Sequence, residues 1–119
     1  WGPLSPEHLL EWEENDKSFV ALAAIQWKIY LNAYESSIQS IAPERLLEVR
    51  YEDLCNQKEE VFSTVLDFCN LENSSRFTRA LTKIKLHSED AKWRRDLKPH
   101  QQAILEQSLE SYLRKYRYA

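Results

Sequence analysis

Glycine and proline are scarce in this sequence. The chain has one glycine and four prolines in 119 residues, whereas sandwiches and barrels contain many short strands joined by turns rich in these two residues. An all-β fold is therefore disfavoured. Long segments without glycine or proline favour helices instead, so we expect a mainly α-helical chain.

Long apolar runs and an excess of positive charge are also missing. No run approaches the roughly 20 apolar residues of a membrane-spanning helix, so we expect no membrane insertion. The 19 acidic and 16 basic side chains are interspersed and sum to a net charge of -3, which gives no overall field for nucleic acid. No targeting segment is visible, and the expected location is the cytoplasm.

Cysteine and histidine are too few for a metal site. Cys55 and Cys69 are predicted to lie at the two ends of one helix, about 21 Å apart at 1.5 Å per residue, where they cannot form a disulfide. Unpaired cysteines fit a reducing compartment. The three histidines are scattered along the chain, so no metal is predicted.

Methionine is absent altogether. Because a translated chain begins with methionine, we expect these residues to be a piece of a longer protein.

Apolar periodicity predicts about five helices. A short helix starts at Ser5 and Pro6, and a long one begins near Lys17 with Asn15 or Asp16 as its cap. The long helix should bury an aromatic-rich face made of Val20, Ala23, Trp27, Tyr30, Tyr34, Ile38 and Ile41.

Capping residues mark the remaining helices. Asp53 or Asn56 is expected to cap the third, and Asn70 to take the left-handed position just past its end. Ser74 or Ser75 would cap the fourth. Pro99 would open the last helix.

A single strand is predicted at 46–51, where apolar and mixed residues alternate. A lone strand leaves two rows of backbone groups without partners, each costing about 1 to 3 kcal/mol when buried. Two solutions are open. The strand pairs with that of a second copy, or it joins a sheet whose other strands lie in sequence absent here.

Several motifs along the chain support the second solution. They are WGP at 1–3, LAAIQWKIYLNA at 22–33, LLEVRYEDL at 46–54, FCNL at 68–71, KWRRDL at 92–97 and the closing RKYRYA. In order and spacing they resemble the C-terminal half of the bacterial-type sulfotransferases. Enzymes of this family transfer a sulfuryl group from 3′-phosphoadenosine 5′-phosphosulfate (PAPS) to an acceptor hydroxyl or amine.

The resemblance implies a fold and a division of labour. Residues 1–119 would be the C-terminal portion of an α/β, P-loop-like domain with a parallel sheet. The partner of this chain would be the missing N-terminal half, which holds the glycine-rich phosphosulfate loop and the general base. No catalytic residue is therefore expected in this chain, which should be inactive alone, and the acceptor is unknown.

The basic segment near the C-terminus is the predicted cofactor site. The resemblance assigns Lys92, Trp93, Arg94 and Arg95 to PAPS, or to its product adenosine 3′,5′-bisphosphate, through the 3′-phosphate, with Arg94 foremost. Ser88 and Ala91 stand where one version of the family motif has glycines. In the alternative interpretation, K-W-R-R is a solvated turn and Trp93 fills the core.

Other candidate residues have structural interpretations. Glu52 and Asp53 are expected to form a salt bridge and a helix cap rather than an acid/base pair. Trp27, Tyr30 and Tyr34 are expected in the core, and His87 on the surface.

A second function remains open. The chain would be a non-enzymatic helical interaction module, a homodimer joined through its single strand.

Overall fold

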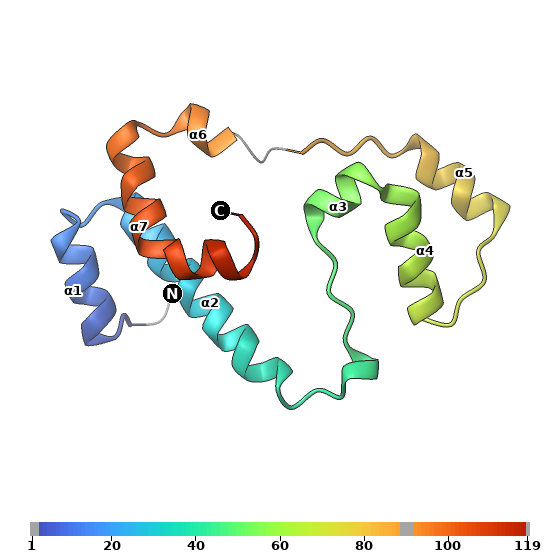
Figure 1. Ribbon diagram of the computed structural model, residues 1–119, viewed down its shortest axis with the longest axis horizontal. Coiled ribbons are helices and arrows are strands. Elements are labelled where there is room, and N and C mark those ends of the chain that lie inside the picture. The colour runs from blue at the N-terminus through green and yellow to red at the C-terminus, as the bar shows by residue number, and fades with distance from the viewer. Residues whose placement is uncertain (1–2, 89–91, 119) are drawn as a thin grey trace. The chain divides into compact units, whose positions relative to one another are not determined.

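A computed structural model describes residues 3–88 and 92–118. Within these residues the chain is helical, with seven α-helices and one short 3₁₀ turn, η1, and no strand (Figure 1). The elements are α1 (Pro6–Glu14), α2 (Phe19–Ile38), η1 (Pro43–Arg45), α3 (Tyr51–Asn56), α4 (Lys58–Phe68), α5 (Ser75–Lys83), α6 (Lys92–Asp96) and α7 (Pro99–Lys115). The prediction of a mainly helical chain is confirmed. The prediction of about five helices was too low, because one helix is broken and the basic segment is itself a helix.

The chain divides into two compact units. The first comprises Trp1–Ser40 and Lys92–Ala119 and contains α1, α2, α6 and α7. The second comprises Ile41–Ala91 and contains η1, α3, α4 and α5.

The core of the first unit lies along α2, which packs against both α1 and α7. Ala21, Ala24 and Ile25 are buried on α2, and Leu109 is buried on α7. The fully buried positions of α2 are therefore shifted by about one residue from the predicted face, on which Trp27 and Tyr34 are half-buried. Tyr30, expected in the core, is 66% exposed. Because two helices pack on α2, its buried positions are not those of a single apolar stripe.

Serine caps begin both N-terminal helices. The predicted cap of α1 is confirmed, because Ser5 Oγ accepts from the backbone N–H of His8 at 3.2 Å. The predicted cap of α2 was wrong, because Ser18 occupies that position and its Oγ accepts from Ala21 N–H at 3.2 Å. Asp16 and Lys17 before it have φ values of 54° and 51°. This left-handed turn postpones the start of α2.

Polar contacts fasten α7 to the C-terminal half of α2. Tyr112 Oη donates to Asn32 Oδ1 at 2.6 Å, and Tyr116 Oη donates to Glu35 Oε1 at 2.7 Å. Lys115 Nζ also lies 2.6 Å from Glu35 Oε1. Hydrogen bonds from Lys115 and Tyr116 lower the pKa of Glu35.

A half-buried carboxylate joins three helices. Glu11 on α1 accepts hydrogen bonds from Lys28 Nζ on α2 at 2.6 and 2.5 Å and from Ser108 Oγ on α7 at 2.5 Å. Burial raises the pKa of Glu11, but the hydrogen bonds from Lys28 and Ser108 outweigh it, and the pKa is lowered. Glu11 therefore favours folding while ionised. Because its folded pKa is depressed, this contribution is present above the unfolded pKa and is lost as pH falls through the folded pKa.

We expect Lys28→Ala to lower the free energy of unfolding by about 1 to 2 kcal/mol at pH 7, since it leaves a half-buried carboxylate without its cation. Urea unfolding of the protein measures the change, and the loss should shrink as pH falls below the usual range for glutamate. The control is Arg114→Ala, which removes an exposed ion pair to Glu110 and should cost less than about 0.5 kcal/mol. Equal losses in both variants would contradict a special role for Glu11.

The strand predicted in the second unit is not formed. Leu46 and Arg50, at the two ends of residues 46–50, have extended dihedral angles (φ −127°, ψ 123° and φ −83°, ψ 137°). No described segment pairs with residues 46–50, and Tyr51 already starts α3. A strand exists only through its ladder of hydrogen bonds, so an extended segment without a neighbour is not one. Pairing across a twofold axis stays a prediction.

The helix predicted around residues 53–69 is interrupted. Gln57 has φ −134° and ψ 48° and separates α3 from α4. Neither Asp53 nor Asn56 caps α4, and Asp53 lies instead in the first turn of α3, where the helix dipole favours an acidic side chain. Cys55 is half-buried, Cys69 is exposed, and both thiols are free.

Two other local signals in the second unit, one stop and one start, were predicted correctly. Asn70 is left-handed, with φ 54°, and Leu71 N–H donates to Leu66 C=O at 2.9 Å, as in a Schellman motif. Ser74 caps α5 through a 3.1 Å bond to Phe77 N–H. In the first unit, Pro99 opens α7 as predicted.

None of the helices in the described part of the chain is both long and apolar enough to cross a membrane.

Candidate functional site

The predicted basic loop contains a helix. Lys92–Asp96 form α6, five residues long, and Leu97 N–H extends it by donating to Trp93 C=O at 3.0 Å. The prediction of a loop at these positions was therefore wrong. Successive residues of a helix point about 100° apart, so Trp93 and the neighbouring basic side chains leave the backbone in different directions.

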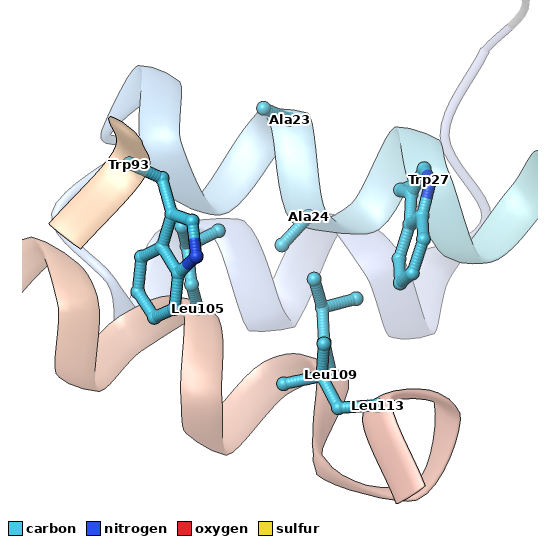
Figure 2. A pocket seen from close by; sticks show the side chains of 7 residues that line it. All are labelled: Ala23, Ala24, Trp27, Trp93, Leu105, Leu109 and Leu113. Carbon is cyan, nitrogen blue, oxygen red and sulfur yellow. The ribbon is translucent and has the colours of Figure 1, made fainter. Parts of the chain in front are cut away.

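Trp93 lies in an apolar groove between α2 and α7. The groove has a volume of about 290 Å³ and is lined by Ala23, Ala24, Trp27, Trp93, Leu105, Leu109 and Leu113. Figure 2 shows Trp93 reaching it from α6 at one end, with Trp27 of α2 at the other. Trp93 is half-buried there. The indole therefore anchors α6 to α2 and α7, as the core-filling alternative predicted.

Arg94 is stacked on the tryptophan beside it. Its Cζ lies 4.6 Å from the centre of the Trp93 ring, within the range of a cation–π interaction. Arg94 also lines a second hollow of about 240 Å³, together with Trp93, Glu106, Glu110, Leu113, Arg114 and Tyr118. Within that hollow Arg114 forms an ion pair with Glu110 at 2.6 Å. Arg94 is exposed, so its remaining N–H groups can reach an anion from solvent.

The other two predicted cations are also on the surface. Arg95 Nε lies 3.1 Å from Asp96 Oδ1, and the two side chains are 71% and 50% exposed. Such an exposed pair is weak, so a doubly charged phosphate can compete for this guanidinium. Lys92 is exposed at the first position of α6. The structure thus brings the three basic residues onto one short helix.

Two side chains of the second unit hold the chain upstream of α6. Lys58 Nζ donates to Ile84 C=O at 2.9 Å, and Tyr51 Oη donates to His87 C=O at 3.3 Å. The His87 side chain is on the surface, as predicted. Ser88 is exposed as well. Three residues named in the motif resemblance lie outside the described residues: Trp1 and Gly2 of WGP, and Ala91.

The residues assigned structural roles behave only partly as expected, because Asp53 is not a helix cap. Glu52 forms the predicted salt bridge, with its Oε2 3.7 Å from Arg50 Nε. Trp27 and Tyr34 are half-buried, whereas Tyr30 is exposed.

Comparison with known proteins identifies a family in the part of the chain that precedes α6. The model of the sulfotransferase family matches residues 8–75. No curated protein matches, and no solved structure matches. The matched range contains the LLEVRYEDL and FCNL motifs and ends before α6. The assignment of α6 to phosphate binding therefore rests on the geometry of α6 and on the motif resemblance.

Proposed function

The chain belongs to the sulfotransferase family, and on this basis we propose that the protein transfers a sulfuryl group from PAPS to an acceptor hydroxyl or amine. The reaction would be an in-line displacement. The sulfur–oxygen bond to the nucleotide breaks, a new sulfur–oxygen or sulfur–nitrogen bond forms, and negative charge develops on the bridging oxygen of the leaving adenosine 3′,5′-bisphosphate.

The part of the work assigned to this chain is recognition of the 3′-phosphate. The observation that carries the assignment is α6, where Lys92, Arg94 and Arg95 are exposed on a helix that Trp93 anchors. A guanidinium presents parallel N–H donors that match two phosphate oxygens. Trp93 and its stacking with Arg94 limit the motion of that donor before the ligand arrives.

The phosphosulfate itself would be bound elsewhere in the protein. A phosphate cradle depends on glycine-rich backbone at a helix start, and the one glycine among these 119 residues is Gly2. The catalytic groups would therefore come from an N-terminal half of the same domain, and these residues alone would be inactive. The extended segment 46–50 is the element that we propose joins the parallel sheet of that half.

Nucleotide titration of the full-length protein tests the function. Adenosine 3′,5′-bisphosphate should bind about 10- to 100-fold more tightly than adenosine 5′-monophosphate, because hydrogen bonds to a charged group are worth about 1.5 to 3 kcal/mol. Labelled PAPS should transfer its sulfuryl group to a member of a panel of alcohols and amines. A protein that binds neither nucleotide and sediments as a dimer would instead favour the interaction module.

A further inference from the structure

One amide side chain of α7 clamps the basic helix. Gln102 lies in the first turns of α7, and its Nε2 donates to Arg94 C=O and to Leu97 C=O, both at 2.8 Å. The Leu97 bond is partly buried. A primary amide has two N–H groups, so these two bonds use both donors of Gln102.

These contacts answer a structural need of α6. The last four carbonyl groups of any helix lack a partner within the helix. Because α6 has five residues, most of its carbonyl groups need a partner from outside the helix. A helix this short is not stable by itself in water. Gln102 satisfies a carbonyl within the helix and one directly after it, and thereby fixes the backbone of Arg94 from the C-terminal side while Trp93 holds it from the groove.

We propose that Gln102 is a positioning residue for the anion site and acts through Arg94. The inference rests on the proposed function, since it concerns the same phosphate contact. Gln102 is neutral and directs its amide at backbone carbonyls, so it contributes no charge to the ligand. Its effect is pre-organisation. With the Arg94 carbonyl held, less conformational freedom is lost when the guanidinium binds the 3′-phosphate.

Gln101 provides a matched control from the neighbouring position. Its Oε1 accepts from Lys98 N–H at 2.9 Å and so caps α7 without contacting Arg94. The variants to compare in the full-length protein are Gln102→Ala, Gln102→Met, which keeps the length of the side chain without its donors, and Gln101→Ala. The measurements are the dissociation constant of adenosine 3′,5′-bisphosphate and the urea midpoint of unfolding.

We expect both Gln102 variants to raise that dissociation constant about three- to tenfold, the range for one or two neutral hydrogen bonds. Gln101→Ala should leave it within about twofold while lowering the unfolding midpoint to a similar extent. In the Arg94→Ala background, Gln102→Ala should have no further effect on binding, because residues that act through one contact are not additive.

Two different results would separate the inference from the function on which it rests. If the unmodified protein does not bind adenosine 3′,5′-bisphosphate, the proposed function fails. If that protein binds and Arg94→Ala weakens binding, but Gln102→Ala and Gln102→Met do not, or Gln102→Ala is fully additive with Arg94→Ala, the positioning role fails and the phosphate contact stands.

Discussion

Replacing Arg94 by alanine should raise the dissociation constant of adenosine 3′,5′-bisphosphate about 10- to 100-fold, equivalent to about 1.5 to 3 kcal/mol. The guanidinium is exposed and stacked on Trp93 at 4.6 Å, which leaves its N–H groups available to two phosphate oxygens. Isothermal titration of the full-length protein measures the change. Arg94→Lys should give an intermediate loss, because an ammonium keeps the charge but not the planar fork.

The control for this experiment is an arginine on the same hollow. Arg114 also borders it but forms a 2.6 Å ion pair with Glu110, so Arg114→Ala should leave nucleotide affinity within about twofold. Adenosine 5′-monophosphate is the matching ligand control, because it has no 3′-phosphate and should bind the Arg94→Ala variant as well as the unmodified protein. Unchanged affinity for the bisphosphate in Arg94→Ala would remove α6 from the phosphate site.

Local chemistry accounts for the predictions that succeeded. Ser5, Ser74, Asn70 and Pro99 each act on backbone groups within a few residues, so the sequence around them contains the necessary information. The predicted cap of α2 was wrong for a reason that is also local. Asp16 and Lys17 both adopt left-handed angles, which are common for glycine, asparagine and aspartate but not for a lysine.

Features that depend on distant residues were not predictable in this way. The buried face of α2 is set by packing with both α1 and α7, and periodicity along one helix cannot show how many neighbours it has. The segment 46–50 has the pattern of a strand, but pairing requires a second segment. Its extended ends show that the pattern describes local backbone preference correctly.

The candidate site likewise has some features that the sequence shows and one that depends on the fold. The density of basic residues at 92–95 is visible in the sequence, and so is the aromatic residue among them. Gln102 gave no signal, because a glutamine in a helix is usually an ordinary surface residue. Only the folded structure shows that its amide donates to two backbone carbonyl groups, one in α6 and one directly after it.

The second large effect is expected at Trp93, which links stability to binding. Trp93→Ala removes half-buried aromatic surface from the groove between α2 and α7, and we expect the free energy of unfolding to fall by about 2 to 3 kcal/mol, less than for a fully buried tryptophan. The same variant removes the ring on which Arg94 is stacked. The dissociation constant of adenosine 3′,5′-bisphosphate should therefore rise about two- to fivefold, which corresponds to the roughly 0.5 to 1 kcal/mol of a cation–π contact at an exposed side chain, measured where the variant remains folded.

Trp27 separates the two effects of this substitution, because it lines the other end of the same groove (Figure 2). Trp27→Ala should lower stability to a similar extent, yet leave nucleotide affinity within about twofold, since Trp27 is not the ring on which Arg94 is stacked. Trp93→Phe should restore most of the stability and part of the affinity, because a smaller ring still fills the groove and still presents a face to the guanidinium. If both tryptophan-to-alanine variants weakened binding equally, the loss would follow from destabilisation of the first unit, and Trp93 would have no separate part in holding Arg94.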